Sequence, residues 1–106
     1  MEQTESFDEV RVRLNAETAR VGWKELERHF ARGVVIRVDA ELDLVEVAAR
    51  MARDDKQALE KWLVGGQVGR PSMDEAASWW ERNADFWAVV TAPFVLIQEI
   101  RPEGPK

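Results

Sequence analysis

Residues 43–63, DLVEVAARMARDDKQALEKWL, constrain the fold more than any other stretch of the chain. Apolar side chains recur at i, i+3, i+4 and i+7 from Leu44, which is the spacing of one helix face. Asp43 and Asp54 each stand three residues before Glu or Gln, the spacing of a capping box. The stretch therefore predicts two short helices that meet at Asp54-Asp55. We expect four of their side chains to be largely buried: Met51, Leu59, Trp62 and Leu63.

The segments before this pair have a helical pattern followed by a β-branched run. Residues 15–33, NAETARVGWKELERHFARG, predict one helix with Asn15 as its N-cap and Gly33 just past its end. Residues 34–38, VVIRV, follow at once and predict a strand.

The segments after the pair predict a short strand, a helix and a closing extended segment. Residues 67–70 form the short strand, and Ser72 with Glu75 has the capping-box spacing that starts a helix ending near Ala84. Residues 87–100 are extended, and Pro93 interrupts them. Since residues 94–97 are apolar on both alternations, we expect a strand covered on both faces.

Together these elements predict a small single α+β domain of winged-helix-like order: helix, strand, helix, helix, short strand, helix, strand. The 106 residues suffice for one core, with 45% apolar and 33% charged residues. We place a disordered acidic tail over residues 1–9, the domain over 10–101 and a loose tail over 102–106. No segment has the length and apolar character of a membrane span or signal peptide, and cysteine is absent, so we expect a cytoplasmic protein.

Charge gives little support to a DNA-binding helix-turn-helix over residues 43–63. The net charge is −5, of which −4 lies in residues 1–9. Residues 43–70 contain five acids and five bases, and two aspartates stand where a recognition helix would begin. The first predicted helix carries a row of bases at i+4 spacing: Arg20, Lys24, Arg28 and Arg32. This row could bind phosphates, or it could be an ordinary solvated helix face. Nucleic acid is therefore not the expected partner.

No catalytic, cofactor-binding or metal-binding residues can be assigned from the sequence. His29 is the single histidine and is expected to be structural, while Asp54-Asp55 and Ser72 are better explained as helix caps. The nucleotide-binding and hydrolase motifs are absent, so an enzyme is not expected and no cofactor is implied.

The five tryptophans predict an aromatic core with one indole at a contact surface. Trp79 and Trp80 are adjacent and would point about 100° apart on a helix. We expect Trp80 at the edge of an aromatic core that contains the other four tryptophans: Trp23, Trp62, Trp79 and Trp87. Trp80, Trp79 and Phe94 are the candidate interface residues, and a homodimer or an unidentified protein is the expected partner.

Four stretches are similar to one family: ETARVGWKELERHFARG (17–33), VDAELDLVEVA (38–48), LEKWL (59–63) with the aspartate pair before it, and WAVVTAPFVLIQE (87–99). They resemble the small bacterial proteins grouped as domain of unknown function family 2288. The family has a Trp where this chain has Phe94, which keeps an aromatic ring. The resemblance implies one short bacterial domain and carries over no site residue. We expect a non-enzymatic protein-interaction module; the alternatives are a winged-helix-like nucleic-acid binder and a small-molecule-binding or enzymatic domain.

Overall fold

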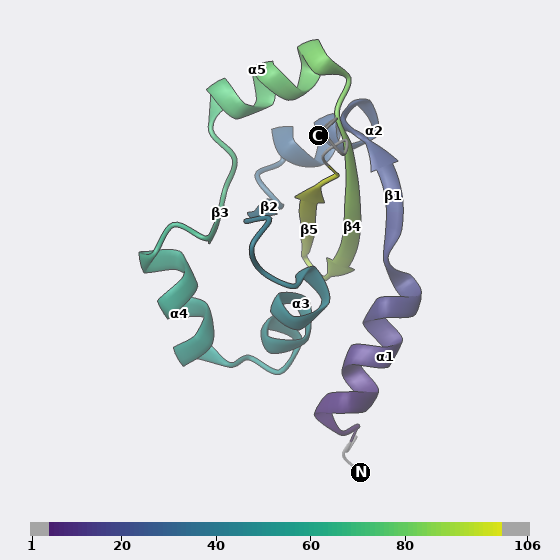
Figure 1. Cartoon of the computed structure of the whole chain (residues 1–106), viewed down its shortest axis with the longest axis vertical. Coiled ribbons are helices and arrows are strands. Elements are labelled where there is room, and N and C mark those ends of the chain that lie inside the picture. The colour runs from purple at the N-terminus through teal and green to yellow at the C-terminus, as the bar shows by residue number, and fades with distance from the viewer. Residues whose placement is uncertain (1–4, 101–106) are drawn as a thin grey trace, which may run out of the picture.

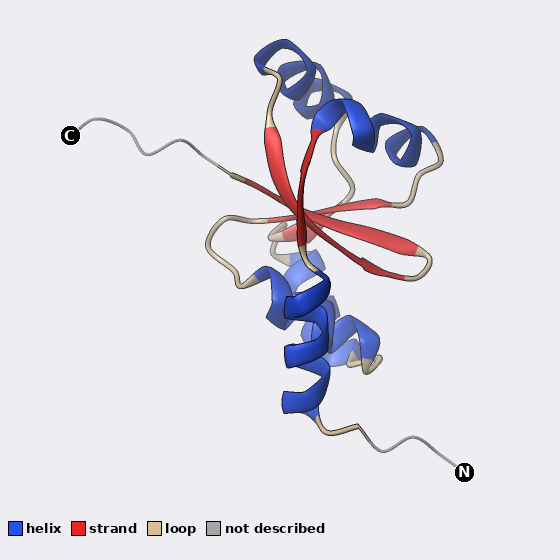
Figure 2. Ribbon diagram, turned by 90° about the vertical axis from the view of Figure 1, so that its right-hand side faces the viewer, coloured by secondary structure: helices blue, strands red, loops and turns tan. Residues whose placement is uncertain are grey.

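The computed structural model describes residues 5–100. The helices are α1 (Phe7–Glu17), α2 (Trp23–Ala31), α3 (Leu44–Ala52), α4 (Lys56–Val64) and α5 (Met73–Arg82). The strands are β1 (Ala19–Gly22), β2 (Val35–Val38), β3 (Val68–Gly69), β4 (Asp85–Thr91) and β5 (Phe94–Glu99). Figure 1 shows the elements along the chain, and Figure 2 shows the sheet between helices on its two sides.

One mixed sheet of five strands organises the domain, in the order β1-β4-β5-β2-β3. β4 and β5 form an antiparallel hairpin in the middle, and β5 runs parallel to β2. β1 and β3 pair antiparallel with β4 and β2 at the two edges. The carboxyl ends of β2 and β5 consequently lie beside each other at one end of the sheet.

The two faces of the sheet carry two separate apolar cores, because successive side chains on a strand point to opposite faces. On β5, Val95 and Ile97 join the core under α2 and α5, which contains Trp23, Trp79 and Phe86. Leu96 joins the core on the other face, where α1 and α3 pack. Residues 95–97 are all buried, so the predicted strand with both faces covered is confirmed.

The single helix predicted over residues 15–33 is wrong in its first half. Asn15 lies inside α1 rather than at an N-cap, and residues 19–22 form the edge strand β1. Hydrogen bonding to β4, in the register Ala19 opposite Ala88, holds this segment extended. The second half is correct: α2 buries Trp23 and Leu26, and Gly33 follows its end with a positive φ of 76°.

The disordered acidic tail predicted for residues 1–9 is wrong for its last residues, which are helical. α1 begins at Phe7, and Ser6 and Glu9 form a capping box in which each side chain accepts the other's backbone N–H. Val10 is buried, so this helix belongs to the domain. Residues 1–4 and the tail predicted over 102–106 lie outside the described residues.

The two helices predicted within residues 43–63 are present as α3 and α4. Asp43 caps α3 by accepting from Val45 and Glu46, as expected. The second cap is Asp55 rather than Asp54, since Asp55 accepts from the Ala58 backbone. Asp54 instead takes a positive φ of 58°, which turns the chain between the helices.

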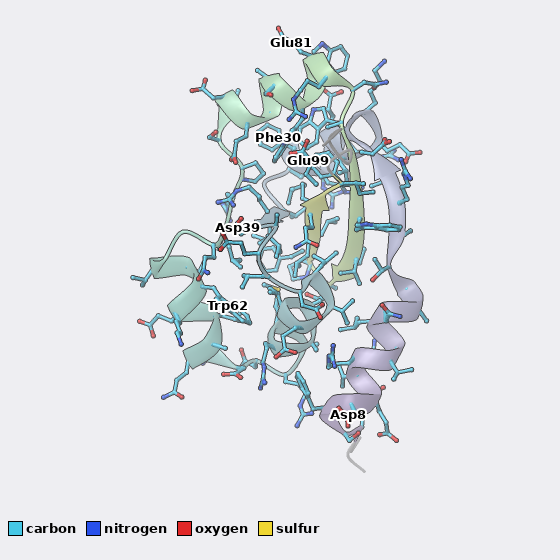
Figure 3. All side chains as sticks on the ribbon, in the orientation of Figure 1. Asp8, Phe30, Asp39, Trp62, Glu81 and Glu99 are labelled. Carbon is cyan, nitrogen blue, oxygen red and sulfur yellow. The ribbon has the colours of Figure 1, made fainter. Side chains whose placement is uncertain are left out.

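The burial predicted for α4 is overstated. None of its residues is buried, and Leu63 is 55% exposed. Trp62 lies between α4 and α3 and is only partly buried (Figure 3). The reason is position: α4 packs against α3 and the edge strand β3 rather than on the central strands of the sheet, so it covers the edge of the core.

The α+β class is confirmed, and the later elements follow the predicted order. Residues 67–70 contain β3, and Ser72 and Glu75 form a capping box at the start of α5. The predicted extended segment 87–100 consists of β4 and β5, with Pro93 in the turn between them. The likeness to a winged helix is loose, because helices cover both faces of a five-stranded sheet. Within residues 5–100, no helix is both long and apolar enough to cross a bilayer.

Candidate functional site

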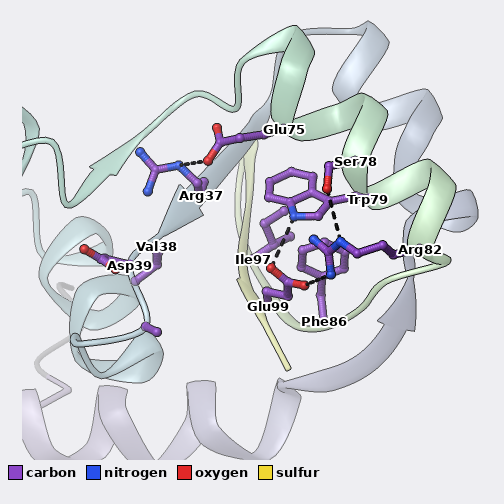
Figure 4. Close-up of a pocket in the computed structure, with 11 residues that line it drawn as sticks. Arg37, Val38, Asp39, Glu75, Ser78, Trp79, Arg82, Phe86, Ile97 and Glu99 are labelled. Atoms are coloured by element: carbon purple, nitrogen blue, oxygen red, sulfur yellow. Dashed lines mark hydrogen bonds and ion pairs between the residues drawn. The ribbon is translucent and has the colours of Figure 1, made fainter. Parts of the chain in front are cut away.

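A charged pocket opens where the carboxyl ends of the parallel strands β2 and β5 meet helix α5 (Figure 4). Its volume is about 320 Å³. Ligand sites in α/β sheets gather at this end of parallel strands, because the flanking elements diverge there. Trp79 and Phe86 supply aromatic surface, and the polar residues are Arg37, Asp39, Glu75, Ser78, Arg82 and Glu99.

One side of the pocket is an ion pair fixed by an indole. Glu99 accepts from Arg82 Nη1 at 2.7 Å and from Trp79 Nε1 at 3.3 Å. Arg82 Nε also donates to the Ser78 hydroxyl at 3.1 Å. The Glu99 side chain is only 16% exposed. Two donors from α5 thus hold a nearly buried carboxylate in one orientation.

The other side of the pocket is a looser ion pair. Arg37 Nε lies 3.3 Å from Glu75 Oε2, and Arg37 Nη2 donates to the Gly66 carbonyl at 3.3 Å. Although Nε is within ion-pair distance, it is buried and not aligned for a hydrogen bond with any acceptor in the described residues. The Nε–H group of Arg37 is therefore not used in a hydrogen bond to Glu75 or to Gly66.

The lining of the pocket carries charges of both signs. Two arginines and three carboxylates line it, so a ligand with both an acidic and a basic group would match it better than an anion. The Ser78 hydroxyl oxygen accepts a hydrogen bond from Arg82 Nε, and no hydrogen bond joins it to a carboxylate or to His29 in the described residues. His29 lies on α2 and is not one of the lining residues.

The structure separates the three candidate interface residues. Trp79 is 4% exposed within the core under α5. Trp80 points away, is 50% exposed, and has Lys24 Nζ 5.3 Å from its ring centroid. Phe94 is partly buried at the start of β5. Only Trp80 and Phe94 therefore offer surface to a partner.

The aromatic core is smaller than predicted. Trp23 and Trp79 pack at 5.1 Å between ring centroids, and Phe86 completes the cluster. Trp87 instead faces the opposite side of the sheet and is 43% exposed. Trp62 belongs to the other core, as a partly buried residue.

The candidate basic stripe does not lie on one helix. Arg20 is on β1 and pairs with Asp85 at 3.0 Å. Lys24 and Arg28 are on α2, and Arg32 is its C-cap. Because Arg20 lies on a strand, only Lys24, Arg28 and Arg32 can share one face of a helix.

An apolar groove surrounds Phe94 at the tip of the β4–β5 hairpin. Its volume is about 530 Å³. Leu14, Met51 and Leu59 line it from α1, α3 and α4, and Val90 at its rim is 59% exposed. The Thr91 hydroxyl is buried without a partner in residues 5–100. Within those residues, no group of His, Cys, Asp or Glu is placed to hold a metal ion.

Comparison with known proteins identifies the relatives of this chain. A family model described as protein of unknown function (DUF2288) matches residues 9–99. The chain belongs to the DUF2288 family. The NMR solution structure of PA1075 from Pseudomonas aeruginosa is similar over 99% of this chain and 94% of that chain, with 42% identity and a TM-score of 0.77. No curated protein matches. The resemblance predicted from the sequence is confirmed, and the fold is shared with PA1075.

The pocket residues of this DUF2288 chain carried no recognisable signal in the sequence. No partner of Glu99 stands near it in the sequence, since Trp79 and Arg82 lie 20 and 17 residues earlier. Arg37 is the polar residue of an otherwise apolar strand, which could have marked it. Only the packing of α5 on the ends of β2 and β5 brings these residues together.

Proposed function

We propose that this DUF2288 chain is a non-enzymatic protein-interaction module of the bacterial cytoplasm. The Phe94 groove is the observation that carries the proposal. Seven of its ten lining residues are apolar, and the groove is open rather than filled by the chain itself. Concave apolar surface on a small domain is costly to leave in water and is typical of contact sites.

A second copy of the chain is the proposed occupant of this surface. Residues 10–106 carry a net charge of only −1, so long-range repulsion between copies is small. Closed two-fold dimers are the commonest oligomers, and aromatic side chains are enriched in their interface centres. Phe94 would lie at the centre, while Trp80 on α5 offers a second contact.

Sedimentation velocity at micromolar concentration tests the dimer. We expect a species of about twice the 12.2 kDa chain mass. Val90→Glu should shift it to the monomer, because a charge at the rim of the groove would be desolvated on association. Val12→Glu is the matched control: Val12 is 70% exposed on α1 and does not line the groove. Trp80→Ala reports on the second contact.

A monomer at all micromolar concentrations would contradict the dimer and leave a different protein as partner. Affinity purification from the native cell, with the Val90→Glu and Val12→Glu proteins as paired baits, then decides. A partner retained by Val12→Glu and lost by Val90→Glu supports the interaction module. Equal recovery by both variants, or none by either, counts against the groove.

A second candidate function is the binding of a small molecule in the charged pocket. The observation that favours it is the buried Arg37 Nε, which lacks an aligned acceptor at the carboxyl ends of two parallel strands. A buried donor left unsatisfied costs about 1–3 kcal/mol, and a well-aligned ligand acceptor would recover the part of that cost that the ion pair with Glu75 does not offset.

Titration of labelled protein with small amino acids tests this candidate, with the Trp79 indole N–H resonance as the reporter. We expect a saturable shift that Arg37→Met removes. Arg20→Met is the matched control, since Arg20 is paired on β1 and lies outside the pocket. An equal loss in both variants, or no shift with any amino acid, would contradict ligand binding there.

A further inference from the structure

Trp87 forms the floor of a groove on the face of the sheet opposite the charged pocket. The groove has a volume of about 610 Å³ and shares no lining residue with the Phe94 groove. Its floor consists of Trp87 and Gln98, which are cross-strand partners on β4 and β5. The end of α1 and the start of α3 form its walls. Trp87 is 43% exposed, so its indole is open to a ligand.

The lining of the Trp87 groove is acidic. Glu41 and Asp43 are its charged residues, and it contains no Lys or Arg. Glu41 is exposed and has no ion-pair partner within residues 5–100. Asp43 Oδ1 accepts from the backbone of α3, while Oδ2 is 3.5 Å from Arg11. A carboxylate at the rim thus remains available to a ligand.

Two arginines beside the groove form ion pairs. Arg11 lies 3.5 Å from Asp43 and 3.7 Å from Glu46, although its Nε has no aligned hydrogen-bond acceptor in residues 5–100. Arg20 is the cross-strand neighbour of Trp87 on β1 and binds Asp85 at 3.0 Å. Neither arginine therefore cancels the negative potential of the groove.

The floor of the groove is held rigidly. The Gln98 amide donates to the carbonyls of Asp39 and Leu42 at 2.9 and 2.7 Å, which ties β5 to the loop before α3. The Thr18 hydroxyl donates to the Leu14 carbonyl at the end of α1. A ligand would meet a surface that needs little ordering, which lowers the entropic cost of binding.

We propose that the Trp87 groove binds a cationic group, an alkylammonium or guanidinium, against the indole face. The negative face of an indole attracts a cation, and nearby carboxylates add to that attraction. A small amine and a basic side chain of a partner protein share this chemistry. The proposal does not depend on the dimer or on the charged pocket, since it uses other residues.

Titration of labelled full-length protein with tetramethylammonium tests the proposal. We expect a saturable shift of the Trp87 indole N–H resonance. tert-Butanol, a neutral molecule of similar size, should produce none. Trp80 is an internal control: it is similarly exposed, but Lys24 already occupies its ring. Its resonance should not move.

Variants separate the charge from the aromatic contribution. Trp87→Leu should weaken binding about tenfold, as expected for loss of a cation–π contact; the Gln98 side-chain amide in the same groove is then the reporter, because this variant lacks the Trp87 resonance. Glu41→Gln should weaken it by a few-fold, since one charge is removed near a partly solvated site. Trp80→Leu, the matched control, should leave the affinity unchanged. An equal response to tert-butanol, an equal shift of Trp80, or no effect of Glu41→Gln would overturn the proposal.

A second titration distinguishes the two sources of the cation. The probe is a lysine peptide with blocked ends, and the reporter is again the Trp87 resonance. Tighter binding than tetramethylammonium points to a basic segment of a protein, and equal or weaker binding points to a small amine. Failure of both probes to shift Trp87 would refute the cationic site.

Discussion

Individual side chains in this domain contribute according to their position relative to the two cores. Trp23 and Trp62 are both tryptophans on helices, yet Trp23 is 1% exposed whereas Trp62 lies at the margin of its core. Trp23 also contacts three other aromatic rings. The same substitution at the two positions should therefore have different energetic effects.

Trp23→Ala should lower the free energy of unfolding by about 3–5 kcal/mol, through lost transfer energy and a residual cavity. Trp62→Ala should cost about 1–2 kcal/mol, because much of its surface is already in water. Chemical denaturation of both variants measures the difference. Equal losses would show that the margin of the second core is packed as tightly as its centre.

A residue near the N-terminus should titrate abnormally. Arg13 donates two hydrogen bonds to Glu5, at 3.1 and 3.2 Å, and these lower the pKa of the Glu5 carboxyl below its ordinary value of 4.5. A lowered folded-state pKa stabilises the fold above the unfolded value, and that contribution is lost as the pH falls through the folded value.

Arg13→Gln should return the pKa of Glu5 towards 4.5 and remove this part of the acid dependence of stability. An NMR titration of the Glu5 carboxyl carbon in both proteins measures the change. An unchanged Glu5 pKa would show that the ion pair does not persist in solution.

At the scale of elements, the junction between α3 and α4 depends on two adjacent aspartates with opposite roles. Asp55 caps α4 and also accepts from Arg50 at 3.2 Å. Asp54 contributes a positive φ, a conformation in which glycine is less strained than any other residue.

Asp55→Ala should destabilise the protein by about 1 kcal/mol, since it removes the cap of α4. Asp54→Gly should be neutral or slightly stabilising, because relief of the positive φ offsets the added freedom of the unfolded chain. Thermal and denaturant unfolding of the pair checks the assignment. A larger loss at Asp54 would mean that Asp54 is the cap, as its spacing alone suggested.

For the whole molecule, charge distribution argues against DNA as a partner. Lys24 and Arg28 share one face of α2, but Glu25 and Glu27 flank that face and reduce its positive potential. The net charge of −5 adds a weak long-range repulsion from phosphates.

We therefore expect no sequence-specific DNA binding, and only weak non-specific binding that falls steeply with salt. Selection from random duplex pools followed by mobility shifts is the measurement. One enriched motif bound with nanomolar affinity at physiological salt would contradict the interaction-module proposal.

The sequence by itself determined the features whose physics is local. The capping box at Ser72, the Asp43 cap, the β-branched β2 and the glycine after α2 each depend on residues within a turn of one another. The capping box at Ser6 had the same spacing and could have revealed α1, but the acidic composition around it favoured a tail. Family membership also followed from short motifs.

Tertiary structure alone decided the features that depend on distant partners. β1 is a strand because residues 85–88 supply its hydrogen bonds, and Arg20 and Asp85 are 65 positions apart. The same long-range pairing placed Trp87 in an open groove and Trp79 in a core. A helical period says which side chains share a face, but it contains no information about what that face meets. For this reason the charged pocket and the two grooves could not be predicted from the sequence, because each is lined by residues from elements that only the folded sheet and its helices bring together.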